Sequence, residues 1–187
     1  MTQKQPVTNN TQPTSKDLPA TDNLLLTNIN GVKIKMLKAW KDKPDLEQKG
    51  VTPGIFMEIL RDDDKLLKKF GQSNFTIAEK GTIKAFHSHR YQDDLWFLAT
   101  GRAAIVLYDG RKNSSTYKKT EVIYGGRDDY KLVLIPAGVI HGYKVLSEDP
   151  VLLFYHVTKS YNPKKPDEIR FDPFDKKINF DWGKLSK

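Results

Sequence analysis

The sequence predicts an all-β protein, either a closed barrel or a jelly roll of two sheets. Three observations support this fold class. Short apolar runs recur between Leu24 and Tyr161, and turn-forming residues separate them, which is typical of many short strands. Only one segment, residues 64–70, has a helical pattern. The chain has 187 residues, 38% of them hydrophobic, which is enough for one domain with a core of its own.

The expected elements follow from the apolar runs and the turns between them. Residues 1–23 are polar and contain little that could be buried, so we expect a disordered tail there and one domain over residues 24–187. Glycine, proline and aspartate mark the turns at 109–110, 125–126, 136–138 and 148–150. The expected strands are 32–37, 55–59, 75–77, 83–89, 95–99, 103–108, 121–124, 132–135, 142–145 and 152–158. From Asn162 the chain is rich in proline and aspartate, which indicates loops that wrap over the barrel.

Composition narrows the kinds of partner. The absence of cysteine excludes disulfides and thiolate metal sites, and it fits a reducing compartment. We find no signal-peptide pattern and no apolar run long enough to cross a bilayer, so we expect a cytoplasmic protein that does not act at a membrane. The net charge of +8 is spread over lysines mixed with aspartates, which favours a solvated basic surface over a nucleic-acid site. Attraction of a small phosphorylated ligand is the other reading of this charge.

The histidines give the first functional signal. His87 and His89 are two residues apart in an expected strand, so both side chains should point to the same face. Ile83 and Ala85 would share that face by strict alternation, which would make it the interior one. Two imidazoles inside a barrel are costly unless they bind something.

The spacing around these histidines is more specific. It runs Gly81, five residues, His87, one residue, His89, four residues, Asp94, six residues and then a glycine; a later Pro-x-Gly-x-x segment ends in His141. This arrangement resembles the two motifs of the cupin superfamily, with Asp94 where the superfamily has glutamate, and it implies a cupin-type jelly roll. In metal-binding cupins the equivalent residues hold one divalent metal ion, here His87, His89, Asp94 and His141. The other interpretation is a set of barrel histidines without metal.

A second resemblance covers more of the chain, from Gly71 to Trp182. Several segments are similar in order and spacing to the dTDP-4-dehydrorhamnose 3,5-epimerases and their relatives. They are Phe56-Met57-Glu58, Gln72-Ser73-Asn74, residues 81–87 (GTIKAFH), residues 136–145 (PAGVIHGYKV), residues 154–158 (FYHVT), Tyr161-Asn162-Pro163, Ile169-Arg170-Phe171 and Phe180-Asp181-Trp182.

This resemblance implies an isomerase of a nucleotide-linked 4-keto-6-deoxy sugar, used in deoxysugar and polysaccharide biosynthesis, with no cofactor. It implies that His87 removes a proton beside the ketone and that Tyr155 returns one from the opposite face. The implied substrate-binding residues are Lys84, His89, His141, Tyr161 and Gln72. It also implies a homodimer, which pairs through N-terminal strands such as 32–37.

Three departures leave alternatives open. Asp94 stands where the family has a pocket lysine, Ser88-His89 replaces a Tyr-Gln pair, and the aspartate that orients the family's base is not found after Trp182. His89 or Asp94 would then have to support His87. The alternatives are a metal-dependent cupin enzyme using the His/His/Asp/His site and a non-catalytic sugar-binding cupin.

Neighbouring side chains need their own assignments. Alternation puts Lys84 on the face opposite His87, so a bulge or a neighbouring subunit is needed to bring it into the pocket. Alternation also turns His156 outward if Tyr155 points inward. We expect the aromatic residues Trp96, Phe97 and Tyr108 to be core residues, and the lysines Lys159, Lys164 and Lys165 to be solvated.

Overall fold

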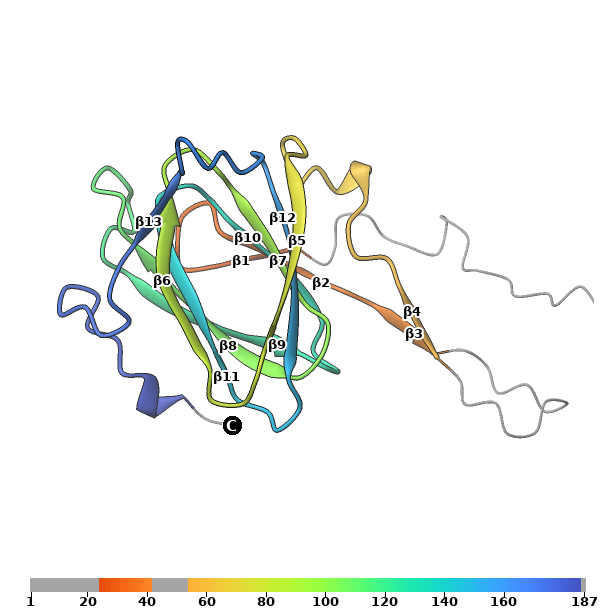
Figure 1. The fold of residues 1–187 in the computed structure, drawn as a ribbon. Helices are drawn as coiled ribbons and strands as arrows, with labels where there is room; N and C mark the ends of the chain where they lie inside the picture. Colours follow the sequence, from red (N-terminus) through yellow and green to blue (C-terminus); the bar gives the residue numbers. More distant parts are fainter. Residues whose placement is uncertain (1–23, 42–53, 186–187) are drawn as a thin grey trace, which may run out of the picture.

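The computed structural model describes residues 24–41 and 54–185, and over this part the chain is almost entirely β-structure. Two antiparallel sheets face each other, as Figure 1 shows, which confirms the predicted two-sheet jelly roll. The expected tail of residues 1–23 lies outside the described residues.

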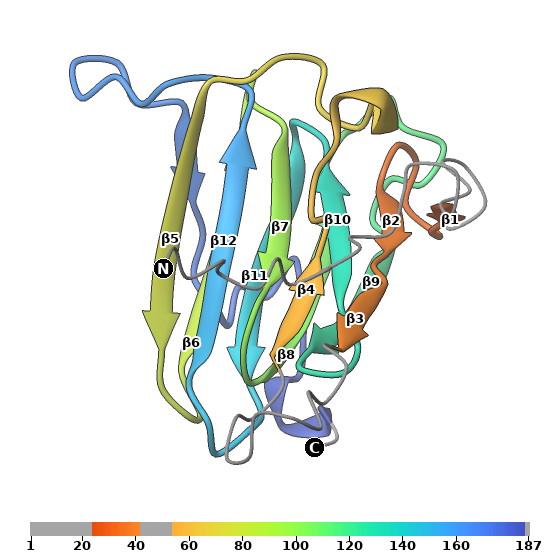
Figure 2. The same ribbon diagram turned by 90° about the vertical axis from the view of Figure 1, so that its right-hand side faces the viewer.

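The larger sheet has six strands in the order β1-β2-β10-β7-β12-β5, and Figure 2 shows its outer face. Their bounds are β1 Leu24–Leu26, β2 Lys33–Met36, β5 Gln72–Ala78, β7 Asp94–Leu98, β10 Lys131–Ile135 and β12 Val151–Val157. Strand β5 forms one edge of this sheet, and β1 forms the other.

The second sheet has five strands in the order β13-β6-β11-β8-β9. Their bounds are β6 Ile83–His89, β8 Arg102–Asp109, β9 Thr120–Gly126, β11 Val139–Val145 and β13 Glu168–Arg170. A separate hairpin of β3 (Ala39–Lys41) and β4 (Ile55–Met57) extends away from the barrel (Figure 1).

Every strand predicted from the sequence is present, with ends that differ by a few residues. The short strands β1, β3 and β13 were not predicted. The expected helix at 64–70 is wrong, because the structure has only a one-turn 3-10 helix there, η2 at Asp62–Asp64. A second 3-10 helix, η3, lies near the end of the described residues at Trp182–Lys184. Strand β2, through which the homodimer was expected to pair, is already paired on both sides within this chain, by β1 and β10.

Apolar side chains form three layers. The innermost fills the space between the sheets. A second lies outside the six-stranded sheet, where Leu66 and the segment after β4 cover β7 and β10. A third lies outside the five-stranded sheet, where Ile178 and Trp182 of the C-terminal segment cover Phe86 and Val106. Trp96, Phe97 and Tyr108 are buried in these layers, as predicted.

One part of the outer surface is left uncovered by the residues that the structure describes. On β5 and β12 the side chains of Phe75, Ile77 and Phe154 point outward and are 62%, 54% and 37% exposed. The rings of Phe75 and Phe154 are 5.8 Å apart, so these side chains form one apolar patch beside the free edge of β5.

Among the described residues, no helix has the length and apolar character needed to span a bilayer.

Candidate active site

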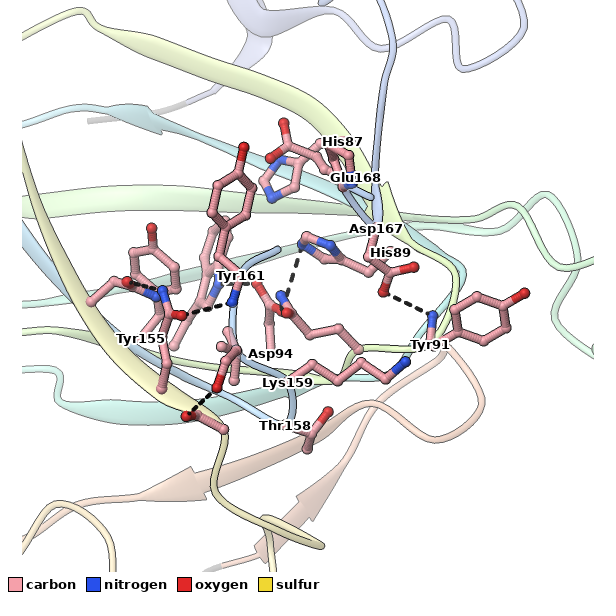
Figure 3. Close-up of a pocket in the computed structure, with 18 of the residues that line it drawn as sticks. His87, His89, Tyr91, Asp94, Tyr155, Thr158, Lys159, Tyr161, Asp167 and Glu168 are labelled. Carbon is pink, nitrogen blue, oxygen red and sulfur yellow. Dashed lines mark hydrogen bonds and ion pairs between the residues drawn. The ribbon is translucent and has the colours of Figure 1, made fainter. Parts of the chain in front are cut away.

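A large pocket lies between the two sheets, with a volume of about 1330 Å³. Its wall comes from strands β5, β6, β7 and β12 and from the segment after β12. Figure 3 shows His87 and His89 on one side of this pocket in the view drawn, Tyr155 on the other, and Tyr161 between them. The cavity is larger than the roughly 300–1,000 Å³ typical of small-molecule sites, so it suits an extended ligand.

A bulge in β6 decides which side chains enter the pocket. His87 is paired with His141 of β11, but Lys84 is paired with Tyr143, so β6 has one residue more than β11 between these pairs. The extra residue resets the alternation, and Lys84 lines the pocket together with His87. This confirms the bulge that the sequence required.

The bulge also corrects the interpretation of the strand's interior face. Ile83 and Ala85 pack against the outer layer under the C-terminal segment, and so they do not mark the face of His87 as interior. Their assignment was wrong because strict alternation was carried through the bulge. Gly142 faces the bulge, and a Cβ atom there would lie 2.3 Å from Cβ of Ala85.

Three imidazoles and one carboxylate meet at the deep end of the pocket. One donor atom from each of His87, His89, Asp94 and His141 lies within 4.8 Å of the others. The ring centroids of His87 and His141 are 4.2 Å apart, and those of His87 and His89 are 5.4 Å apart. The four residues that the sequence spacing grouped are therefore together in space.

Backbone contacts fix the His141 ring and the end of the strand that contains His89. Nδ1 of His141 donates a hydrogen bond to the carbonyl oxygen of Val139 at 2.9 Å, which leaves Nε2 with the free lone pair in the neutral ring. The Pro-x-Gly turn before β11 contacts the end of β6, since the amide of Gly138 donates to the carbonyl of His89 at 2.7 Å. His141 is 1% exposed, so it lies behind the pocket wall and does not line the open cavity.

Asp94 is the only carboxylate of this cluster, and it is 2% exposed. Its two oxygens accept hydrogen bonds from the side chains of Gln92 (2.8 Å) and Trp96 (3.1 Å), and each lies 3.7 Å from Nε2 of His89 or His141. Burial opposes its ionisation, but the neighbouring imidazoles and the Gln92 amide outweigh burial and lower the pKa of Asp94. Asp94 is therefore an anion buried in the floor of the pocket.

The pKa of His87 is strongly lowered, first by burial and then by the neighbouring imidazoles of His141 and His89. Burial also lowers the pKa of His89. Both rings are therefore neutral near pH 7. Among the described residues no carboxylate forms an ion pair with His87; the rings of His141 and Trp96 lie beside it instead.

Tyr155 faces the three imidazoles of this cluster from the opposite sheet, the one that also contains Asp94. It lines the pocket from β12, and His156 points away from the pocket and contacts Ser73 of β5, as the alternation predicted. Burial raises the pKa of Tyr155, and it raises that of Tyr143 deeper in the barrel to about 12. Tyr155 is therefore a protonated phenol at neutral pH.

The remaining expected residues line the wider part of the pocket. The ammonium of Lys84 donates to Oγ1 of Thr76 at 2.5 Å. Oε1 of Gln72 accepts a hydrogen bond from the backbone of Tyr161 at 2.8 Å, so these two residues are held together at the rim.

Several rim residues were missed by the sequence analysis. Five further cations line the pocket, namely Lys69, Arg90, Lys159, Lys165 and Arg170. Lys159 and Lys165 were expected to be simply solvated, but they belong to this rim, where the ammonium of Lys159 lies 4.7 Å from the Tyr91 ring centroid. Two acids, Asp167 and Glu168, line it as well. The available signal was the 169–171 segment of the family resemblance, because β13 pairs with β6 directly beside His87 and His89.

Comparisons with known proteins agree with this geometry. The sequence model of the dTDP-4-dehydrorhamnose 3,5-epimerase family matches residues 27–187. A spore coat polysaccharide biosynthesis protein of Bacillus subtilis is 47% identical over 155 residues, which is 83% of this chain and 97% of that protein.

Two solved structures are similar as well. A 3,5-epimerase of Legionella pneumophila, crystallised with dTDP-4-keto-L-rhamnose, has a TM-score of 0.72 at 26% identity and covers 86% of this chain and 82% of its own. A dTDP sugar isomerase of Desulfovibrio desulfuricans has a TM-score of 0.74 at 23% identity, covering 87% of this chain and 97% of its own, which shows the shared fold.

Proposed function

The chain belongs to the dTDP-4-dehydrorhamnose 3,5-epimerase family, and we propose that it epimerises a nucleotide-linked 4-keto-6-deoxy sugar with His87 as base and Tyr155 as proton donor. The observation that carries this assignment is the placement of a neutral imidazole and a protonated phenol on opposing sheets of one pocket.

The shape and charge of the pocket support the substrate class. A volume of about 1330 Å³ leaves room for both a sugar and a nucleotide. The exposed cations at the rim suit a diphosphate, while the buried end offers neutral rings to an uncharged sugar. The Legionella relative, whose structure contains a dTDP-linked keto sugar, is consistent with this class.

The chemical step needs only proton transfers. The 4-keto group acidifies the neighbouring C–H bond, so the lone pair of His87 takes that proton and the bonding electrons move into an enolate. The O–H of Tyr155 then protonates the same carbon from the other face, which inverts it. Substrate and product are isomers, so no oxidant or reductant is consumed, and we propose that the step requires no cofactor.

Lys84 is the cation we assign to the enolate oxygen. It is the cation of β6 that the bulge turns into the pocket, where its ammonium bonds a neutral hydroxyl group. A positive charge near a developing oxyanion stabilises the transition state more than the ground state.

Solvent isotope exchange tests the assignment. We expect the protein to introduce deuterium from heavy water into a dTDP-linked 4-keto-6-deoxy sugar beside the ketone. His87→Ala should abolish this exchange, and His156→Ala, which changes an outward histidine, should not. Tyr155→Phe should retain exchange but lose inversion, because the second-face proton donor is gone. Exchange that survives His87→Ala would refute the mechanism, and binding without exchange in the wild type would leave a sugar-binding role.

We also propose a homodimer in which a second copy covers the bare patch of Phe75, Ile77 and Phe154. These side chains flank the free edge of β5, and both an exposed edge and an apolar patch favour pairing. Light scattering at micromolar concentration should give twice the mass of one chain. Phe154→Glu should give the monomer mass, whereas Phe174→Glu, at a ring that is 71% exposed elsewhere, should not. A wild-type monomer would contradict the proposal.

We place the reaction in polysaccharide biosynthesis in the cytoplasm. The 47% identical Bacillus subtilis relative is named for spore coat polysaccharide biosynthesis, and the absence of cysteine fits a reducing compartment. Cell fractionation tests the location.

A further inference from the structure

The deep end of the pocket contains more donor atoms than proton transfer needs. One base is enough to remove a proton, yet three imidazoles and a carboxylate meet with their donor atoms within 4.8 Å of one another. Ligands of one ion that are each about 2.1 Å from it lie up to roughly 4.2 Å from each other. The bound of 4.8 Å exceeds this limit by about 0.6 Å, so small side-chain movements would bring the four donors to the separation of a single shared ion.

Two of these imidazoles present buried nitrogen atoms without a partner. Nδ1 of His89 and Nε2 of His141 are out of contact with solvent, and neither has a hydrogen-bond partner among the described residues. Such atoms cost about 1–3 kcal/mol each when they are left unsatisfied. The backbone bond from Nδ1 of His141 aims its free Nε2 toward Asp94, which is how a ligating histidine is normally oriented.

The carboxylate of the cluster is held in place for coordination. Asp94 is buried, and within the described ranges its oxygens lie 3.7 Å from Nε2 of His89 and of His141, with no lysine or arginine paired to them. Its hydrogen bonds from Gln92 and Trp96 come from neutral groups, and they fix the carboxylate as supporting bonds do in metal sites.

From these contacts we infer that His87, His89, Asp94 and His141 bind one divalent transition-metal ion. Imidazole and carboxylate donors without thiolate suit Zn²⁺, Fe²⁺, Co²⁺, Ni²⁺ or Mn²⁺ rather than Ca²⁺ or Mg²⁺. The site as such does not depend on the epimerase assignment, because it follows from donor type, spacing and charge.

One consequence does rest on the proposed function. Neutral imidazole has a single lone pair, and that of His87 can accept either a metal ion or a proton from the sugar, but not both. Metal binding and proton abstraction by His87 therefore exclude each other. A divalent ion in this site acts as a reversible inhibitor of the epimerase.

Direct metal binding tests the site. Co²⁺ is titrated into chelator-treated protein without an affinity tag, and its visible absorption reports coordination by protein ligands. We expect saturation at one ion per chain, with Zn²⁺ displacing Co²⁺. Asp94→Asn and His89→Gln should each weaken binding by more than about tenfold, since even loss of a supporting partner costs 10–100-fold. His156→Gln is the matched control, because it removes a histidine on the outer face and should leave binding unchanged.

Two results would overturn the site. One is a wild-type protein with no saturable Co²⁺ absorption; the other is wild-type affinity in both Asp94→Asn and His89→Gln. Circular dichroism checks that each variant is folded. If Asp94→Asn fails to fold, His89→Gln and the rise in the wild-type melting temperature on adding Zn²⁺ still decide the question.

The exclusion is tested with the same protein and the exchange assay. Deuterium exchange into a dTDP-linked 4-keto-6-deoxy sugar should fall with Zn²⁺ occupancy and return when chelator removes the ion. Exchange that persists or rises with the site filled would overturn the exclusion. Absence of exchange even with chelator would refute the proposed function, and the exclusion with it, but would leave a site shown by Co²⁺ binding intact.

Discussion

Replacing Gly142 by alanine should damage the active site, although Gly142 itself does not line the pocket. Gly142 lies on β11 opposite the bulge of β6. A Cβ atom built at this position lies 2.3 Å from Cβ of Ala85, 2.7 Å from its Cα and 2.8 Å from the carbonyl oxygen of Lys84. All three atoms belong to the segment that turns Lys84 and His87 to the same face.

The size of the effect follows from these distances. Carbon atoms in contact prefer a separation of about 3.5–4.0 Å, so β6 must move away by roughly 1 Å. Overpacking of this kind costs about 1–3 kcal/mol of folding free energy. A displacement of about 1 Å in a catalytic group can cost about 100-fold in rate. A 100-fold loss of rate corresponds to about 2.7 kcal/mol, so we expect the activation free energy and the folding free energy to change by similar amounts.

Two measurements and one control check this expectation. Urea denaturation gives the free energy of unfolding, and deuterium exchange into the keto sugar gives the activity. Gly125→Ala is the control, because its Cβ would meet its nearest atoms, Asp129 O and Leu98 Cδ1, at the ordinary distances of 3.5 and 3.7 Å. Wild-type stability and activity in Gly142→Ala would refute the view that this close approach holds the bulge in place.

Two further predictions concern charge in the folded protein. Because the pKa values of His87 and His89 are lowered on folding, the unfolded chain takes up protons near pH 6.5 that the folded chain does not, so stability should fall as the pH drops below about 7.5 and should keep falling toward the lowered pKa values of the folded state. For each histidine the loss is at most about 1.4 kcal/mol per pH unit in chelator-treated protein. Urea titrations of His87→Gln at several pH values should give a smaller slope of stability against pH. An unchanged slope would contradict the assignment of this loss to His87. Asp109, which is fully buried and bonded to Arg111, Ser114 and Thr116, should cost roughly 3 kcal/mol when changed to asparagine. Lys184 forms an exposed ion pair with Asp181 at 3.8 Å, so Lys184→Ala should change the free energy of unfolding by less than about 1 kcal/mol. Equal losses in Asp109→Asn and Lys184→Ala would contradict this ranking.

The strands could be predicted from the sequence because each is a short apolar run and turn-forming residues separate one run from the next. The ends of β6 agree with the expected 83–89. The position of the bulge could not be read in the same way, since a bulge depends on the register with the facing strand and not on the residues of one strand alone. The assignment of Ile83 and Ala85 to the interior face was wrong for this reason.

The candidate site, too, could be predicted only in part. The grouping of His87, His89, Asp94 and His141 was predictable because short spacings and a Pro-x-Gly turn mark all four; the histidines lie on the neighbouring strands β6 and β11, and Asp94 on β7 of the facing sheet. The rim residues Glu168 and Arg170 could not be predicted in this way. They reach the pocket through the pairing of β13 with β6, which is a contact between segments about 80 residues apart. Short polar strands such as β13 carry too little apolar pattern to be recognised.

The distribution of charge along the pocket joins the two proposals. The exposed rim is cationic, with Lys69, Arg90, Lys159 and Lys165, while the buried floor contains the anion Asp94. A ligand with an anionic diphosphate and an uncharged sugar is therefore drawn in with its sugar toward the histidines, because the reverse orientation would place phosphate against a buried carboxylate. The same buried carboxylate attracts a small cation when no sugar is present. Asp94 thus orients the substrate and favours the metal ion at the same place, and the two ligands compete for His87.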